Sequence, residues 1–140
     1  MSACFRSSHN KAQFTVFKQQ HVVRLLLRQG ELFDVVFSYS SVEHNGLGRY
    51  GDPLAPFGDV EAVAQMWCLV RPGGLLFLGL PSYHTQSQRR RACHIVWNVH
   101  RVYGYSRLQH VTANWEVLEE VNIGDRVPHM FYVLRRLDVV

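Results

Sequence analysis

Two short apolar stretches, FDVVFS at residues 33–38 and LLFLGL at residues 75–80, decide the fold class of this chain. Each is almost wholly apolar over about six residues, which is typical of strands buried on both faces, as in parallel sheets. Asp34 is the charged exception near the start of the first stretch. We therefore predict two parallel strands here, and the residues between them must supply the connection.

The connection contains a helix that begins at Asp59. Asp59 is the predicted N-cap and Glu61 lies in the first turn, where acidic side chains are favourable. The helix carries one apolar stripe, made of Val60, Val63, Ala64 and Trp67. The sequence RPGG at residues 71–74 ends it. Strand, helix and strand together predict a βαβ unit.

A long loop, residues 42–58, joins the first strand to this helix and is rich in Gly, Pro, Asp and Asn. Long loops inside small domains are usually functional or disordered. In open α/β sheets, ligands bind beyond the carboxyl ends of the strands. This loop leaves the first strand at that edge, so we expect the functional site there.

The flanking segments are simpler. Residues 1–12 are polar and predicted to be a mobile tail, so the domain is expected to span residues 13–140. Apolar spacing from Phe14 predicts a helix that ends near Gly30. Residues 95–103 fit either a helix or a strand, and residues 106–113 fit a short helix. Residues 115–121 and 130–134 predict an antiparallel hairpin at the sheet edge.

Composition narrows the function classes. The chain has 140 residues, 47% of them hydrophobic, so one packed domain is expected. A net charge of +4 argues against a dedicated nucleic-acid binder, although Arg89, Arg90 and Arg91 form a basic run. Three cysteines without a C-x-x-C pair argue against a zinc site, and we expect no metal. No signal peptide and no run of roughly 20 apolar residues is present, so a cytoplasmic location is expected.

The motifs resemble a known family. FDVVFSYSSVEH at residues 33–44 and RPGGLLFLGLP at residues 71–81 resemble the C-terminal half of class I S-adenosylmethionine-dependent methyltransferases. More narrowly, residues 38–63, which include EHNGLGRYGDP, and NVHRVYG at residues 98–104 resemble a family of proteins of unknown function first named from Caenorhabditis. The resemblance implies a partial Rossmann-like α/β sheet with parallel strands, a crossover helix and a C-terminal antiparallel hairpin.

The resemblance also implies roles for residues at the loop. Glu43 and His44 are the candidate catalytic pair, because histidine titrates near neutral pH and can accept a proton. Alternatively, both hold the loop through hydrogen bonds. Backbone of the matching segment lines the methionine part of S-adenosylmethionine, which makes Ser38, Tyr39 and Ser40 candidate cofactor-binding residues. Simple strand termination is the alternative.

Substrate-binding candidates come from two motifs, and a small-molecule or glycan-like acceptor is expected. They are Arg49 and Tyr50 in the loop, and Asn98, His100, Arg101 and Tyr103 in NVHRVYG. The planar fork of Arg49 suits a carboxylate or phosphate, but pairing with Asp52 within the loop is favoured. The alternative for the second group is a surface segment whose polar tips reach solvent.

One departure from the methyltransferase pattern limits the implied function. Those enzymes hold the cofactor with a glycine-rich turn after their first strand, and no G-x-G sequence precedes Phe33. We therefore expect a domain that lacks the N-terminal cofactor-binding strands and does not bind S-adenosylmethionine fully by itself. The alternative is a non-catalytic or truncated interaction or regulatory module. For this alternative, residues 33–38 should expose an unpaired sheet edge, through which the chain would self-associate.

Overall fold

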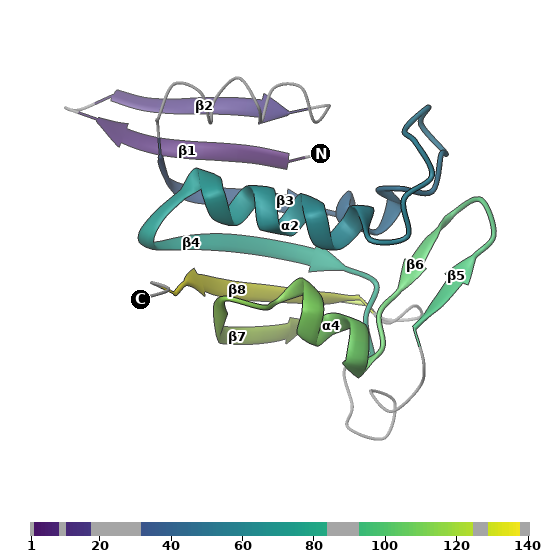
Figure 1. Ribbon diagram of the computed structural model, residues 1–140. Coiled ribbons are helices and arrows are strands. Elements are labelled where there is room, and N and C mark those ends of the chain that lie inside the picture. Colours follow the sequence, from purple (N-terminus) through teal and green to yellow (C-terminus); the bar gives the residue numbers. More distant parts are fainter. Residues whose placement is uncertain (1, 9–10, 18–31, 84–92, 125–128, 138–140) are drawn as a thin grey trace.

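A computed structural model describes residues 2–8, 11–17, 32–83, 93–124 and 129–137 (Figure 1). They form a six-stranded sheet with the strand order β2-β1-β3-β4-β8-β7. The strands are β1 (Ser2–Ser8), β2 (Lys11–Phe17), β3 (Phe33–Tyr39), β4 (Val70–Leu80), β7 (Trp115–Asn122) and β8 (Met130–Arg136). The two stretches that decide the fold class, β3 and β4, are central, adjacent and parallel.

Helix α2 (Gly58–Leu69) connects β3 to β4 and completes the predicted βαβ unit. It begins one residue before the predicted start, with Phe57 as N-cap, so Asp59 is a buried helical residue rather than the cap. Its apolar stripe is also rotated from the predicted one: the buried side chains are Ala62, Val63, Met66 and Leu69. The helix ends at Leu69, close to the predicted end, but the RPGG segment belongs to β4, which begins at Val70 rather than at the predicted Leu75.

One face of the sheet carries the core. Leu76, Leu78 and Leu80 of β4 pair with Leu134, Tyr132 and Met130 of β8, and all six side chains are buried. Helices α2 and α4 (Tyr105–Val111) lie over this face (Figure 1). Alternate side chains of a strand point to opposite faces of the sheet. The side chains that point toward the two helices are therefore buried, and their neighbours on the other face are less buried.

The other face is less covered than the sequence predicts. Phe37 and Tyr39 in β3 are 40% and 43% exposed, so the prediction that residues 33–38 are buried on both faces is wrong at Phe37. Phe37 contacts Phe131, and Phe131 stacks on Phe77, each pair with ring centroids 6.0 Å apart. The described helices lie on the opposite face, so on this face the rings shield one another from water.

The N-terminal strands correct two predictions. β1 pairs antiparallel with β3, with Ser2 opposite Ser38, and it also pairs antiparallel with β2. The mobile tail predicted for residues 1–12 is therefore wrong for the residues of β1 and for the start of β2. Phe14 lies in β2 rather than in a helix, and the rest of that predicted helix lies outside the described residues.

The pairing of β1 also removes the predicted free edge at residues 33–38, because β1 satisfies the backbone groups on that side of β3. Among the described strands, β2 and β7 are the outer ones. The basic run at residues 89–91 lies outside the described residues. No described helix has the length and apolar character that crossing a membrane requires.

The C-terminal predictions are confirmed. β7 and β8 form the antiparallel hairpin, and α4 is the predicted short helix. The segment that the sequence left open is a small two-stranded sheet of β5 (His94–Val96) and β6 (His100–Val102). This β5–β6 hairpin stands apart from the main sheet, beside the loop that follows β3 (Figure 1).

Candidate functional site

The candidate site lies where β3 ends. Ser38 is fully buried, Tyr39 is partly exposed, and Ser40 has a left-handed backbone with φ of 46°. The backbone N–H of Ser40 donates to the carbonyl of Gly79 in β4, 2.9 Å away. The three predicted cofactor-binding residues therefore lie at the carboxyl edge of the two parallel strands.

A single turn of 3-10 helix, η1 (Val42–His44), then places Glu43 beneath this edge. Glu43 is only 1% exposed. Its Oε1 accepts a hydrogen bond from the Ser40 hydroxyl at 2.8 Å. Its Oε2 is buried and has no hydrogen-bond partner in the part of the chain that the structure describes. A buried hydrogen-bond acceptor without a partner lowers the stability of the folded state.

His44 is held in one tautomer by the β5–β6 hairpin. Its Nδ1 lies 2.6 Å from the carbonyl oxygen of Val99. A carbonyl can only accept, so Nδ1 carries the proton and donates it to this bond. In the neutral ring, Nε2 then keeps its lone pair. Nε2 lies 3.9 Å from Oε1 of Glu43, and the His44 side chain is 15% exposed. This nitrogen is equipped to accept a proton.

Further rings surround the pair. The ring of His44 lies 5.5 Å from that of Tyr50 and 6.2 Å from that of His100, both edge-on. Burial lowers the pKa of His100 below its ordinary value, against the opposing charge of Glu43. The neutral form of His100 is therefore favoured, and its ring lies beside that of His44.

His129, just before β8, also adjoins this edge. Its ring lies 5.1 Å from that of Tyr39. Burial lowers the pKa of His129 too, and Glu43 again opposes the shift. Its Nε2 is a second buried polar atom without a hydrogen-bond partner among the described residues. Sequence reasoning missed His129, because it lies far from the loop motif in sequence.

The loop is held by side chains that bind its backbone. Asp52 accepts from the backbone N–H of Gly46 at 2.6 Å and from that of Tyr50 at 3.3 Å. Burial raises the pKa of Asp52, but these bonds outweigh it and lower the pKa net. Arg49 donates to the carbonyl of Val99 at 3.0 Å. The predicted Arg49–Asp52 pair is therefore wrong, because backbone groups take both side chains.

Two predicted substrate residues bond to the loop and to the start of α2 instead. Arg101 is 2% exposed and donates to the carbonyl oxygens of Asn45, Ala55 and Pro56. Tyr103 is fully buried, and its hydroxyl donates to Asp59 at 3.0 Å. Both side chains are therefore buried and bonded within the protein, in contrast to the exposed substrate contacts that NVHRVYG suggested.

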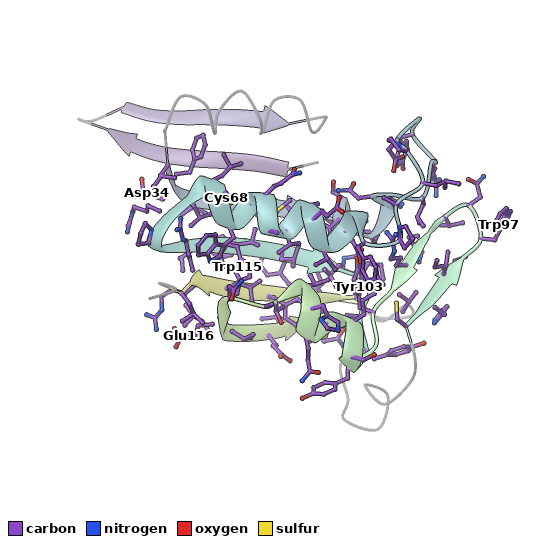
Figure 2. All side chains as sticks on the ribbon, viewed as in Figure 1. Asp34, Cys68, Trp97, Tyr103, Trp115 and Glu116 are labelled. Carbon is purple, nitrogen blue, oxygen red and sulfur yellow. The ribbon has the colours of Figure 1, made fainter. Side chains whose placement is uncertain are left out.

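Asp59 is the centre of a buried charge network. Arg107 donates to both of its carboxylate oxygens, at 2.8 Å from Nε and 2.6 Å from Nη2, and Nε of Arg101 is 3.9 Å away. Burial alone would raise the pKa of Asp59, but Arg107, Arg101 and Tyr103 together lower it. Figure 2 shows Tyr103 between the end of α4 and the hairpin. Sequence reasoning missed Arg107, whose partner lies far upstream.

The last predicted substrate residue, Asn98, lies in the turn between β5 and β6 with φ of 50°, next to the exposed Trp97 at the tip (Figure 2). Between this hairpin and the loop there is an open pocket of about 590 Å³. It is lined by Gly46, Leu47, Leu54, Ala55, Pro56, Cys93, His94, Ile95, Arg101 and Arg107.

Comparison with known proteins now places the chain. Residues 7–132 match the family described as Caenorhabditis protein of unknown function, DUF268. The chain belongs to this family. The match includes β3, the loop, the β5–β6 hairpin and β7, so the motifs that hold the candidate site lie within the family region. A search of curated proteins finds no match.

Solved structures with a similar fold are methyltransferases. The N-methyltransferase NodS from Bradyrhizobium japonicum WM9, in complex with S-adenosyl-L-homocysteine, matches 81% of this chain with a TM-score of 0.53 and 17% identity. The 1,6-didemethyltoxoflavin-N1-methyltransferase from Burkholderia thailandensis, with bound 1,6-didemethyltoxoflavin and S-adenosylhomocysteine, matches 87% with a TM-score of 0.54 and 12% identity. This family member therefore has a class I methyltransferase-like α/β fold.

The chain spans 52% of the NodS chain and 59% of the Burkholderia chain. At these identities the likeness concerns the fold. The residues at the carboxyl edge of β3 must therefore be interpreted from their own geometry.

Proposed function

We propose that this chain is a methyltransferase-like domain in which the loop after β3 forms the acceptor side of the site. The observation that carries the proposal is the line of groups from the Val99 carbonyl through His44 to Glu43. It fixes the tautomer of a partly exposed imidazole and places a carboxyl group beside the opposite nitrogen. Such an arrangement suits general base catalysis.

The proposed chemistry of this pair is the removal of a proton from a nucleophile. Nε2 of His44 accepts the proton from the nitrogen or oxygen of a bound acceptor molecule, while Nδ1–H stays bonded to Val99. The imidazolium that forms is stabilised by Glu43, 3.9 Å away. The acceptor is left with a free electron pair, which is what any methyl transfer to it requires.

The cofactor of the similar structures fits the described residues of this chain only in part. A glycine-rich turn follows a parallel strand at its carboxyl end, and no G-x-G precedes Phe33. β1 is antiparallel to β3, with Ser2 opposite Ser38, so its amino end lies at the edge where a cradle would be needed. The hydroxyl of Ser40 is already bonded to Glu43. We propose that the described residues alone do not retain S-adenosylmethionine.

Calorimetric titration with S-adenosylhomocysteine tests the cofactor part of the proposal. We expect no measurable heat, which corresponds to a dissociation constant weaker than about 1 mM. One-to-one binding in the micromolar range would refute it, and would restore Ser38, Tyr39 and Ser40 as cofactor-binding residues.

Nitrogen-15 NMR of the histidine rings tests the proton-acceptor part separately. In the neutral ring of His44 we expect the proton on Nδ1 and none on Nε2. The opposite tautomer would remove the base from the proposal, whatever the result with S-adenosylhomocysteine.

The second candidate is a non-catalytic interaction or regulatory module. One observation favours it: of the residues that the resemblance assigned to substrate, Arg101 is bonded to the loop at Asn45 and Tyr103 is bonded to Asp59 of α2. For this candidate the tautomer of His44 has no consequence. Replacement of His44 by Asn should then leave every activity of the protein unchanged, whereas the catalytic proposal expects loss of methyl transfer in a form of the protein that binds S-adenosylmethionine.

A further inference from the structure

The open pocket between the loop and the β5–β6 hairpin, which we call the loop–hairpin pocket, has no part in the proposed proton transfer. Its volume of about 590 Å³ is within the usual range of small-molecule sites. Neither Glu43 nor His44 is among the residues that line it. A ligand of this pocket is therefore separate from the acceptor of the proposed function.

The wall of the loop–hairpin pocket is mainly apolar. Leu47, Leu54, Ala55 and Pro56 contribute to it from the loop, and Ile95 contributes from the hairpin. The side chains of Leu54 and Ile95 are 82% and 55% exposed. Removing apolar surface from water is favourable, so the pocket suits a molecule with an apolar body.

The charged groups of the pocket carry a surplus positive charge. Arg101 and Arg107 line it, and guanidinium groups do not lose their proton in proteins. Their shared counter-ion is Asp59, whose pKa is lowered despite its burial because the two arginines stabilise the carboxylate. Two cations and one anion leave a charge of +1 in this network. None of the described residues that line the pocket is acidic, and burial raises the pKa of the Cys93 thiol, which is therefore neutral at neutral pH.

One guanidinium nitrogen of Arg107 remains available to a ligand. Nε and Nη2 donate to Asp59, and Nη2 also donates to the carbonyl of Pro56. Nη1 has no hydrogen-bond partner among the described residues, and it is not a buried atom. Arg101, by contrast, is 2% exposed and donates to carbonyl oxygens of the loop. An accessible N–H that carries part of a positive charge forms strong hydrogen bonds with anions.

We propose that the loop–hairpin pocket binds an organic monoanion, a carboxylate on an apolar body, with one carboxylate oxygen accepting from Nη1 of Arg107. The apolar body lies against Leu54 and Ile95. A monoanion matches the single surplus charge of the network. One available nitrogen matches one carboxylate oxygen, whereas a phosphate group offers several acceptors that would stay unpaired here.

Phenylacetate, phenylacetamide and acetate are the probes that test the site. The first two have the same shape and differ in charge, whereas acetate has the charge without the ring. Each is titrated into the chain at neutral pH while the ring protons of His94, which lines the pocket, are followed by NMR. Phenylacetate should bind roughly tenfold more tightly than phenylacetamide, because only phenylacetate accepts a charge-assisted hydrogen bond. Acetate should bind more weakly than phenylacetate, because it buries no ring.

Two cysteines of the chain report where the probe binds. Cys93 lines the pocket, whereas Cys68 is exposed on α2, and both are free thiols. Both are alkylated with N-ethylmaleimide, and the rate at each position is followed by mass spectrometry of the peptides. Phenylacetate at about ten times its dissociation constant should slow the alkylation of Cys93 about tenfold. The rate at Cys68 should not change, and equal protection of both thiols or of neither would overturn the pocket as the binding place.

A matched pair of variants tests the charge at the pocket wall. Leu54 is 82% exposed, so L54D and L54N should both fold, which circular dichroism verifies. The two new side chains have the same shape, but only that of L54D is an anion. L54D should bind phenylacetate about threefold more weakly than L54N, because like charges repel across the pocket. Both variants should bind phenylacetamide equally, and equal binding of phenylacetate to both would contradict an anion site.

Equal affinities of the native chain for phenylacetate and phenylacetamide, or no saturation by phenylacetate below about 10 mM, would overturn the anion site. Equal affinities for acetate and phenylacetate would overturn the part of the proposal that concerns the apolar body. Neither outcome changes the expected tautomer of His44, which tests the proposed function separately.

Discussion

Replacement of Asp59 by Asn is the sharpest test of how the loop is held. The carboxylate is fully buried and accepts hydrogen bonds from Arg107 and Tyr103, with Arg101 alongside. Asn keeps the shape but removes the charge, so two guanidinium groups lose their common counter-ion. Breaking a buried ion pair by removing one partner costs about 3–5 kcal/mol. Because the Arg107 side chain is 20% exposed and partly solvated, we expect the lower end, about 3 kcal/mol.

Urea denaturation followed by tryptophan fluorescence measures this cost, and thermal melting should show Tm lowered by roughly 10 °C. The matched control is E116Q. Glu116 pairs with Arg135 at 2.6 Å, but both side chains are exposed by more than 40%. Surface pairs contribute about 0–1 kcal/mol. A loss for D59N no larger than that for E116Q would refute the view that Asp59 anchors the loop.

The pH dependence supplies an independent check with a defined sign. The pKa of Asp59 is lowered in the folded protein, so its contribution to stability is present above its unfolded pKa, about 3.9. That contribution disappears as the pH falls through the folded value. The difference in unfolding free energy between the native chain and D59N should therefore be constant near neutral pH and shrink below about pH 4.

Three further predictions concern single positions. G46A should lower the free energy of unfolding by at least about 2 kcal/mol more than G51A does. Both glycines have positive φ, but a Cβ at Gly46 would lie 2.1 Å from the carbonyl oxygen of Ala55, whereas one at Gly51 meets no atom within 4 Å. Equal losses of unfolding free energy in urea denaturation would contradict the clash. His100 should titrate below about 6.5 by NMR, since burial lowers its pKa, and a value above 7 would contradict its placement. W97A should change the unfolding free energy by less than about 0.5 kcal/mol, because Trp97 is 90% exposed; a larger loss would indicate a contact at the hairpin tip.

Local sequence patterns predicted correctly those strands whose own residues carry a clear apolar or alternating pattern. The apolar stretches of β3 and β4 predicted adjacent parallel strands, because such stretches are stable when helices cover them. The alternation in β7 and β8 predicted an antiparallel hairpin for a different reason, since strands with one face on the core and one toward solvent alternate apolar and polar residues. The position of the loop followed from topology, because it must leave β3 at the carboxyl edge.

Local patterns failed where long-range backbone pairing decides the structure. The polar residues of β1 have no distinctive pattern, yet the strand is held by hydrogen bonds to β3. The face of α2 that is buried was likewise misjudged at Ala64, which is exposed, while Met66 is buried. In each case the deciding partner is another element, which the local sequence does not contain.

The sequence by itself determined which family the motifs resemble, where the loop lies and that Glu43 and His44 stand at its start. Only the tertiary structure decided what these residues do. The Val99 carbonyl that fixes the tautomer of His44 is 55 positions away, and the loop carbonyl at Asn45 is bound by Arg101, 56 positions away. Hydrogen bonds select donors and acceptors by distance and angle in space. Residue type made Arg49 and Asp52 look like partners, and geometry gave each of them to the backbone.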